Sequence, residues 1–368
     1  NFTCLVGLNG SGKSTVLQAI DFLSQLMDGD IDGWLSQRHW DRADINSKLT
    51  KESNIEFKIE VASIYGLITW SGSVNRGTLR CTQERVEIDN DTYLSVKDNY
   101  CNISKKMGLE HIANGFAFPA HKFPIVFEYQ GSILSQLKDV QTNLPLHELK
   151  KAILAIRSLD LLSPELLRSR TKESKGRLGL GGEKLSAFIH EAGSEGKDRL
   201  KQDLLEVYPQ LEEIHTRSLR SGWKQLEITE NFGHQMLKST ARHMNDGMLR
   251  LMAILSQLEG DNEFLIFDEI ENGINPELVE YLVDHLVQSS HQVLVTTHSP
   301  MILNFMEDDV AADGVVYLYK NNEGITQSIK LFSIPSMAKK IEFMGPGEAF
   351  VDTDLTHLYQ EIETLIQQ

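Results

Sequence analysis

The stretch Gly7-Leu8-Asn9-Gly10-Ser11-Gly12-Lys13-Ser14 decides the fold of this chain. It fits the pattern G-x-x-x-x-G-K-[ST], in which glycines let the backbone turn tightly and direct successive N–H groups at a phosphate. The apolar residues 2–6 before it predict a buried strand, and the spacing of apolar residues after it predicts a helix over 15–27. The order strand, glycine loop, helix predicts a nucleotide-binding P-loop.

The P-loop supplies most of the predicted contacts with the phosphates. The N-terminal end of the helix adds its partial positive charge. Lys13 can reach the β- and γ-phosphates, and Ser14 can bind Mg²⁺. The predicted nucleotide-binding residues of this loop are Asn9, Gly10, Ser11, Gly12, Lys13, Ser14 and Thr15.

The bulk composition restricts the class of protein. The chain has 368 residues and only three cysteines, Cys4, Cys81 and Cys101. No apolar run approaches the ~20 residues of a membrane helix, and no signal peptide is visible. We therefore expect a cytoplasmic globular protein without a membrane segment, a disulfide or a cysteine metal site. Because a P-loop strand normally lies inside a sheet, we also expect further strands to precede Asn1.

The charge balance restricts contact with nucleic acid. The formal net charge is −16, from 36 Lys and Arg against 52 Asp and Glu. So acidic a protein cannot bind nucleic acid over its whole surface, and any contact must use a local basic patch or a partner. Residues 172–177 form a locally basic loop, although such a loop is more often only solvated.

A second strand end carries two acids. Residues 264–267 are apolar and are followed by Asp268 and Glu269. Ligands of open α/β sheets bind at the C-terminal ends of the strands. We predict that Asp268 holds Mg²⁺ and that Glu269 polarises the water that attacks the γ-phosphate. A strand that simply enters a solvated loop can also end in Asp-Glu, and the P-loop upstream favours the functional interpretation.

A third strand end leads to a histidine. The apolar residues 293–295 are followed by Thr296-Thr297-His298. A parallel sheet would place His298 beside the P-loop and the acidic pair, where it could donate a hydrogen bond to the γ-phosphate and sense its loss. Lys13, Glu269 and His298 are therefore the predicted catalytic residues.

Taken in order, these motifs resemble an ABC-type ATPase head. After the P-loop come a long insertion, Asn245-Asp246-Gly247-Met248-Leu249-Arg250, then Asp268-Glu269-Ile270-Glu271-Asn272-Gly273-Ile274-Asn275-Pro276, and then Thr297-His298-Ser299. The nearest group is the RecF/SMC/OLD-like ATPases, the AAA family type found in prokaryotic genome-maintenance and anti-phage systems. The resemblance implies ATP and Mg²⁺ as ligands and makes His298 the switch histidine.

The resemblance also implies roles for residues outside the three strand ends. Asn245, Asp246 and Gly247 stand at the signature loop, which in such heads caps the γ-phosphate bound to the opposite protomer; Asn replaces the usual Ser. Asn275 stands at the D-loop in place of the usual Asp. Gln130, after a predicted strand, is the choice for the Q-loop glutamine that binds Mg²⁺.

The Asn245 stretch can also be interpreted from its residues alone, without the resemblance. It starts a predicted helix, whose unpaired N–H groups suit an anion. If it cannot reach its own P-loop, the anion belongs to a second copy, and two such contacts about a two-fold axis close a dimer around two ATP molecules. The alternative is an ordinary Asn helix cap.

We predict an α/β fold, a P-loop NTPase of the ABC-head type with a mixed sheet, an antiparallel β subdomain and a helical insertion. Strands are expected within 54–88, at 124–129 and at 224–232, and a hairpin near 315–329. Helical spacing is expected over 144–208, including Leu149, Ile153, Ile156 and Leu159, and again over 245–258. The predicted segments are 1–99 (N-terminal part of the head), 100–222 (largely helical insertion), 223–345 (C-terminal part of the head) and 346–368 (helical tail).

By the resemblance, the function is a Mg²⁺-dependent ATPase subunit whose heads form a homodimer, or part of a higher oligomer, in a DNA-surveillance or anti-phage complex. About 70 residues follow His298, too few for the C-terminal Toprim nuclease of OLD-type proteins, so the effector, such as a nuclease, is expected on a separate chain. A RecF-like DNA-repair ATPase and a regulatory scaffold that binds ATP without turning it over remain alternatives. A transporter ATPase is disfavoured by the long insertion and the Asn-Asp-Gly loop.

Overall fold

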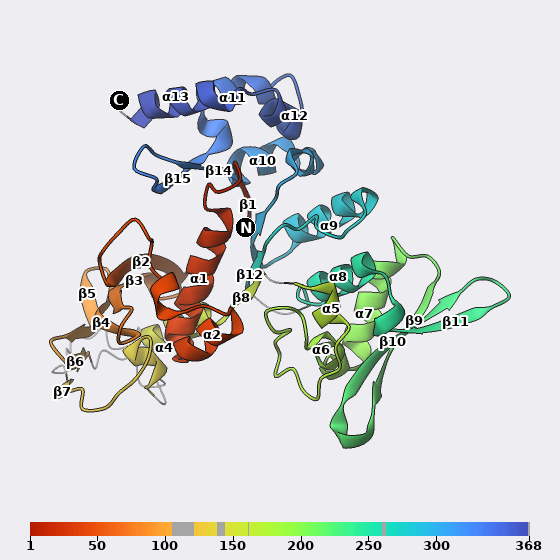
Figure 1. Cartoon of the computed structure of the whole chain (residues 1–368), viewed down its shortest axis with the longest axis horizontal. Coiled ribbons are helices and arrows are strands. Elements are labelled where there is room, and N and C mark those ends of the chain that lie inside the picture. The colour runs from red at the N-terminus through yellow and green to blue at the C-terminus, as the bar shows by residue number, and fades with distance from the viewer. Residues whose placement is uncertain (105–120, 138–143, 161, 260–262, 367–368) are drawn as a thin grey trace. The chain divides into compact units, whose positions relative to one another are not determined.

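The computed structural model divides the chain into two compact units (Figure 1). The first is formed by residues 1–18 and 157–368 and the second by residues 19–156. Residues of the predicted segment 100–222 occur in both units. The structure describes residues 1–104, 121–137, 144–160, 162–259 and 263–366.

The first unit is built on a mixed sheet in the order β15-β14-β1-β13-β12-β8. β1 pairs in parallel with β13 and β14, β12 pairs in parallel with β13, and β15 runs antiparallel to β14. The strands β1, β12 and β13 are apolar and largely buried, as expected for strands covered on both faces. The strands are β1 (Phe2–Val6), β8 (Ile156–Leu159), β12 (Phe264–Phe267), β13 (Gln292–Thr296), β14 (Val315–Lys320) and β15 (Thr326–Lys330).

This strand order brings the three predicted motifs to one edge of the sheet. Phe2 of β1 pairs with Val293 of β13, and Phe267 of β12 pairs with Val295. Since the three strands are parallel, their C-terminal ends meet at the same edge, where the P-loop, the acidic pair and the histidine follow. The predicted strands and the closing β14–β15 hairpin are confirmed. Helix α9 (Pro276–Gln288) connects β12 to β13.

A second, three-stranded antiparallel sheet in the order β11-β10-β9 belongs to the same unit. Its strands are β9 (Leu211–Ser218), β10 (Lys224–Asn231) and β11 (Met236–Thr240). Leu226 and Ile228 of β10 are buried and Glu227 between them is less so, which is the pattern that predicted this strand, although Thr229 is buried as well.

Helices of the first unit pack their apolar faces into one continuous core with the mixed sheet. The face of α8 is buried along its length, from Met248 to Leu255, so the predicted helix is confirmed with slightly shorter bounds. The helices are α5 (Pro164–Leu167), α6 (Leu185–Glu191), α7 (Gly193–Leu205), α8 (Asp246–Leu255), α9 (Pro276–Gln288), α10 (Asp308–Gly314), α11 (Pro335–Ile341), α12 (Pro346–Val351) and α13 (Leu355–Ile366).

The second unit contains a six-stranded antiparallel sheet whose strands follow one another in chain order, β2 to β7. Within the predicted range 54–88 the strands are confirmed, and the sheet continues beyond it. Its strands are β2 (Asn54–Ser63), β3 (Gly66–Asn75), β4 (Arg80–Ile88), β5 (Asp91–Lys97), β6 (Tyr100–Ile103) and β7 (His121–Pro124), and the nearby helices are α2 (Ile31–Gln37) and α4 (Leu144–Leu154); α1 spans Lys13–Asp28.

Two local predictions are wrong. The strand predicted over 124–129 is not formed, because β7 ends at Pro124, and Val126 beyond it is 85% exposed. The helical spacing through Ile156 and Leu159 is also misleading, because α4 ends at Leu154 and these two residues belong to strand β8. In both places the apolar spacing does not say which other strand is available for pairing. Among the described residues, no helix is both long enough and apolar enough to cross a bilayer.

Candidate nucleotide-binding site

The P-loop leaves β1 and enters α1 with its lysine folded inward. Lys13 is only 5% exposed, and its ammonium donates hydrogen bonds to the backbone oxygens of Gly7 (2.8 Å) and Leu8 (3.4 Å). Burial lowers the pKa of Lys13, and the charges of Asp268, Glu269 and Glu271 oppose that shift. The lysine therefore lies close to the carboxylates of the acidic strand end.

The turn of the P-loop requires glycine at Gly12. Its φ is +107°, and a Cβ at this position would lie 2.4 Å from Thr326 Oγ1. Thr326 lies at the start of β15, and its hydroxyl donates a hydrogen bond to the backbone oxygen of Ser11 (2.9 Å). The β14–β15 hairpin therefore supports the P-loop from the side.

Ser14 and Asp268 meet across the sheet edge. Ser14 Oγ donates a hydrogen bond to Asp268 Oδ2 (2.8 Å), although the two residues are far apart in sequence. The other carboxylate oxygen of Asp268 accepts a hydrogen bond from the buried hydroxyl of Thr296. The carboxylate is thus fixed by β13 on one side and shared with the P-loop on the other.

Glu269 lies beside His298 in a strained backbone conformation. Its carboxylate is 2.8 Å from His298 Nε2, and Asn272 Nδ2 lies 3.3 Å from its second oxygen. The φ of Glu269 is +47°, in the left-handed region that non-glycine residues rarely adopt. Strain of this kind persists where surrounding contacts impose it, and here the backbone N–H donates to Thr296 Oγ1 (2.9 Å).

Glu271 holds the histidine loop in place. Its Oε1 accepts hydrogen bonds from Thr297 Oγ1 (3.0 Å), His298 N (2.8 Å) and Ser299 N (3.1 Å). Its Oε2 is buried and has no hydrogen-bond partner among the described residues. A single carboxylate therefore fixes the backbone that carries His298.

The helix α8 joins the acidic strand end to the Asn245 loop. Arg250 of α8 is 7% exposed, and its Nη2 donates to the backbone oxygens of Asp268 (3.2 Å) and Glu269 (3.0 Å). Burial lowers the pKa of this guanidinium, while the charge of Glu269 opposes the shift. The position of the carboxylates is therefore coupled to the position of α8.

Asn245 caps α8, and the two residues after it are exposed or half-buried. Asn245 Oδ1 accepts a hydrogen bond from Met248 N (2.7 Å). Asn245 is therefore a helix cap, which was the alternative interpretation of this stretch in the sequence. Asp246 forms an ion pair with Arg168. A Cβ on Gly247 would lie 3.2 Å from the backbone oxygen of Gly273, so the signature-like loop lies against the D-loop-like turn.

The remaining predicted residues lie at separate places. Asn275 is exposed at the start of α9, where its backbone oxygen accepts a hydrogen bond from Leu278 N. Asn9, Gly10 and Thr15 are exposed around the P-loop. Their nucleotide contacts remain predictions.

Gln130 belongs to the second unit, where its amide is already paired with Asp32. Its Nε2 donates to Asp32 Oδ2 (2.7 Å), and its Oε1 accepts from Asp32 N (3.0 Å). Both ends of the amide are therefore engaged by the start of α2. Its role as an Mg²⁺ ligand remains a prediction.

The residues fit a triphosphate with Mg²⁺. The buried Ser11 Oγ has no hydrogen-bond partner among the described residues, so it is available to a phosphate oxygen. A Cβ added to Gly10 would have no atom within 4 Å, so there is open space on this side of the loop. The oxygens of Ser14 and Asp268 are hard ligands of the kind Mg²⁺ prefers. In the described ranges, no group of three His, Cys, Asp or Glu side chains could hold a metal ion by itself.

Four supporting residues were not predicted as site residues. Thr296, Thr326, Glu271 and Arg250 act through contacts with residues distant in sequence. Glu271 and Arg250 lie within the quoted motifs, so their position next to predicted site residues was a usable signal. Nothing in the local sequence around Thr326 points to the P-loop.

The chain is similar to one known family and to several solved structures. A family model described as "AAA domain, putative AbiEii toxin, Type IV TA system" matches residues 2–64 and 237–304. A structure of an Smc head bound to the C-winged helix domain of ScpA is 13% identical, covers 89% of this chain and 90% of its own, and has a TM-score of 0.51. An Smc head from Pyrococcus furiosus is 17% identical, with 93% of each chain covered and a TM-score of 0.45. No curated protein matches this sequence.

Proposed function

Since this chain has the fold of Smc-type P-loop ATPase heads and an AAA family model matches part of it, we propose that it is a Mg²⁺-dependent ATPase. The observation that carries the proposal is the hydrogen bond of Ser14 to Asp268 together with the contact of Glu269 with His298, all at one sheet edge. Lys13 binds the β- and γ-phosphates in this proposal after exchanging its present contacts with backbone oxygens. Mg²⁺ offsets the charge of the phosphates when it is bound.

The chain's own side chains divide the work of hydrolysis. Glu269 accepts a proton from the attacking water, because it is the acid at the strand end whose carboxylate is not shared with the P-loop. His298 orients that carboxylate and donates to the γ-phosphate. Thr296 and Glu271 hold the two residues in place.

The assembly in this proposal is a pair of heads joined by ATP. The N-terminal end of α8 offers backbone N–H groups at Asp246 and Gly247, and such ends bind anions. Within the described residues, no hydrogen bond or ion pair joins this loop to the P-loop of the same chain. The phosphate it contacts would therefore belong to a second copy, in a two-fold arrangement.

Hydrolysis is tested by phosphate release from the purified chain with ATP. We expect release that requires Mg²⁺ and is lost in Lys13→Ala, with Lys339→Ala, which changes an exposed lysine of α11, as the matched control. Mg²⁺-independent release, or release unchanged in Lys13→Ala, would exclude this site as its source. Absence of release together with ATP binding would favour the scaffold alternative.

Assembly is tested by sedimentation with the Glu269→Gln variant, which should trap ATP. We expect a doubling of mass with ATP and Mg²⁺ but not with ADP. Gly247→Asp, which places a charge against the incoming phosphate, should abolish the change. A mass that does not respond to ATP would contradict the two-copy arrangement.

A role in defence beside a separate effector is part of the proposal. The matched family model is described by an AbiEii-type toxin of a toxin–antitoxin system, and this supports a defence role over a purely metabolic one. The RecF-like repair role remains the alternative. Co-purification of the natively expressed chain with a nuclease or another effector would support the first, and damage sensitivity on deletion would support the second.

A basic surface of the first unit is the candidate contact for nucleic acid. Residues 168–177 and 217–224 carry eight Lys and Arg against one Glu, in a chain of net charge −16. Lys224 N donates to Thr171 O (2.8 Å), which joins the two segments, and Lys172 lies over the exposed ring of Trp223. An exposed aromatic among cations suits a nucleic-acid strand. Salt-dependent DNA binding that is lost in a Lys172→Glu, Arg220→Glu double variant would support it, and unchanged binding would contradict it.

A further inference from the structure

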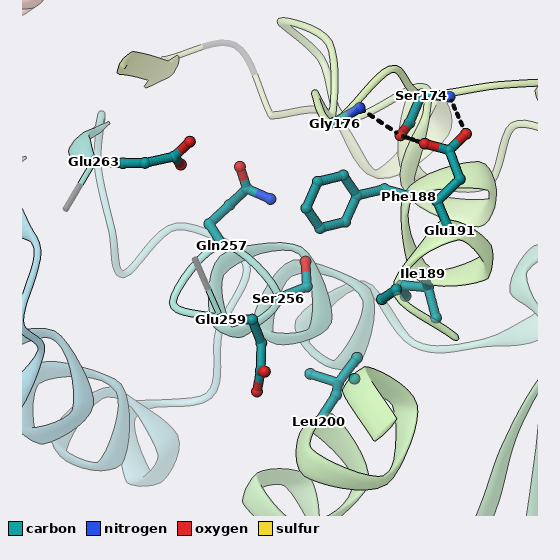
Figure 2. A pocket seen from close by; sticks show the side chains of 12 residues that line it. Ser174, Gly176, Phe188, Ile189, Glu191, Leu200, Ser256, Gln257, Glu259 and Glu263 are labelled. Atoms are coloured by element: carbon teal, nitrogen blue, oxygen red, sulfur yellow. Dashed lines mark hydrogen bonds between the residues drawn. The ribbon is translucent and has the colours of Figure 1, made fainter. Parts of the chain in front are cut away.

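A cavity of about 320 Å³ opens in the first unit (Figure 2). Its described lining residues are separate from those of the nucleotide site. The volume lies near the lower end of the roughly 300–1,000 Å³ of small-molecule sites, so it suits one ring system better than a whole nucleotide. The wall comes from α6, α7, the loop before α6 and the segment after α8.

One wall of the cavity is apolar. Phe188 and Ile189 of α6 and Leu200 of α7 line it, and Figure 2 shows the Phe188 ring directed toward the Gln257 amide. An aromatic ring in such a wall offers a face for stacking a flat ligand. The apolar wall alone would accept many small molecules, so selectivity has to come from the polar groups.

Gln257 supplies an unpaired donor. This residue is 4% exposed, and its Nε2 is buried without a hydrogen-bond partner among the described residues. A buried amide group with no partner is destabilising, by more than the net gain from an ordinary hydrogen bond. The Gln257 amide therefore favours a ligand that presents an acceptor oxygen or nitrogen.

The charged lining residues are carboxylates that already have partners. Glu191 accepts hydrogen bonds from Ser174 N (2.7 Å) and Ser174 Oγ (2.5 Å), while Glu259 and Glu263 are paired with Arg199 and Arg157. Burial alone would raise the pKa of Glu191, but the hydrogen bonds from Ser174 lower it, so the group is ionised at neutral pH. These oxygens can accept further N–H donors.

The described lining contains no lysine or arginine. A phosphate in the cavity would therefore have no cation of the lining to neutralise it, and the carboxylate of Glu191, which is not paired with an arginine, would repel it. The ligand must be uncharged or cationic, flat, and able both to accept from an amide and to donate to a carboxylate.

We propose that this cavity binds a nitrogen heterocycle without phosphate, of the nucleobase or nucleoside class, with its ring on Phe188 and its acceptor edge on the Gln257 amide. Nucleobases carry acceptors and N–H donors side by side on one flat ring, which matches the two kinds of group that the cavity offers.

The position of the cavity would allow its ligand to influence ATP hydrolysis. This part of the inference rests on the proposed function. Ser256 and Gln257 follow the C-terminal end of α8, and Glu263 precedes β12. α8 begins at the Asn245 loop, and Arg250 within it contacts the backbone of Asp268 and Glu269. A ligand that shifts α8 or β12 would therefore change the geometry of the acidic strand end.

The test uses Lys13→Ala protein, in which the P-loop does not compete for the probe. Adenosine, guanosine, cytidine and uridine are each titrated by calorimetry against this protein. We expect one of them to bind one to one. Gln257→Leu in the same background should weaken that binding by about tenfold, since it removes one hydrogen bond. Gln288→Leu, an exposed glutamine at the end of α9, is the matched control and should bind unchanged.

A second variant guards against misfolding of Gln257→Leu. Ala192→Phe introduces a ring from an exposed position of the cavity rim and should block the same nucleoside. The proposal would be overturned if none of the four nucleosides binds. It would also be overturned if the Gln257→Leu and Ala192→Phe proteins both bind the nucleoside as tightly as the Lys13→Ala parent does. If a nucleoside binds in this Gln257-dependent way while the wild-type chain releases no phosphate from ATP, the cavity proposal stands and the ATPase proposal fails.

Discussion

Glu269 combines a predicted catalytic role with a backbone conformation that is costly for its residue type. A φ of +47° destabilises a non-glycine residue by roughly 1–2 kcal/mol relative to glycine. Its contact with His298 is half-exposed and contributes little to offset this. The conformation instead presents the carboxylate beside the histidine, as is typical of strained residues at active sites.

The strain can be measured by a pair of variants that both remove the carboxylate. Glu269→Gly should have a free energy of unfolding about 1 kcal/mol higher than Glu269→Ala, because only glycine adopts this φ without strain. Urea denaturation of the two variants makes the comparison. Equal stability, or a more stable alanine variant, would mean that residue 269 is not held in this conformation.

Glu271 is expected to position His298 rather than to react. Glu271→Ala leaves the backbone N–H of His298 without its acceptor, while Ser299 N keeps its bond to Thr297 Oγ1, and should lower the free energy of unfolding by about 1 kcal/mol. Phosphate release should fall while ATP affinity stays near wild type. Glu271→Gln keeps one acceptor oxygen and should recover part of the lost stability and part of the lost phosphate release. Glu280→Ala, an exposed acid of α9, serves as the control. A Glu271→Ala protein with wild-type turnover would remove this positioning role.

Glu84 in the second unit makes stability depend on pH. Burial raises the pKa of this carboxyl, although hydrogen bonds from Ser132, Ile133 N and Trp70 oppose the shift. The folded state therefore binds the proton more tightly than the unfolded state, and the stabilisation is complete below the unfolded pKa and is lost as pH rises through the raised pKa. The stability of wild type relative to Glu84→Gln should fall as pH rises from about 4.5. A difference that stays constant with pH would contradict this.

At the scale of elements, the P-loop depends on the β14–β15 hairpin. Gly12 and Gly10 both have positive φ, but a Cβ on Gly12 would collide with Thr326, whereas a Cβ on Gly10 meets open space. Gly12→Ala should therefore weaken ATP binding much more than Gly10→Ala. Adding Thr326→Gly to Gly12→Ala should restore part of the binding, and fluorescent-nucleotide titration measures all three. If the two alanine variants behave alike, contact with the hairpin does not shape the loop.

Elements with a strong local signal could be predicted from the sequence. β1, β12 and β13 are continuous apolar runs that end in polar motifs, and α8 and the β14–β15 hairpin have clear periodicity or a turn signal. The strand β8 was mistaken for helix because its buried residues, Ile156 and Leu159, happen to lie three positions apart. The partner that decides between the two structures is β12, which is remote in sequence.

The candidate site was predictable to a similar extent. Residues delivered by strand ends, such as Ser14 and Asp268, could be expected to meet because parallel strands end at one edge. The support from Thr326 could not, because it depends on register and side-chain direction across the sheet. Thr296 lies within the quoted histidine motif, but its bond to Asp268 depends on the same two features.

At the scale of the whole molecule, the acidic chain carries a local basic surface in the first unit, formed by residues 168–177 and 217–224. The ion pair of Arg168 with Asp246 joins that surface to the loop proposed to cap a second nucleotide. An anionic partner on the basic surface would compete with Asp246 for the guanidinium of Arg168. Binding of that partner would therefore change the position of the loop at Asn245–Gly247. This gives the proposed nucleic-acid contact a route to the proposed ATPase.

The most direct measurement of the central claim is a single-turnover experiment with excess enzyme over labelled ATP, comparing wild type with Glu269→Gln. If the P-loop, the acidic strand end and the histidine act on one triphosphate, both proteins should bind ATP with similar affinity. Phosphate release should then be slower by about a hundredfold or more in Glu269→Gln, which has lost its proton acceptor. Equal rates of release in the two proteins would contradict the account.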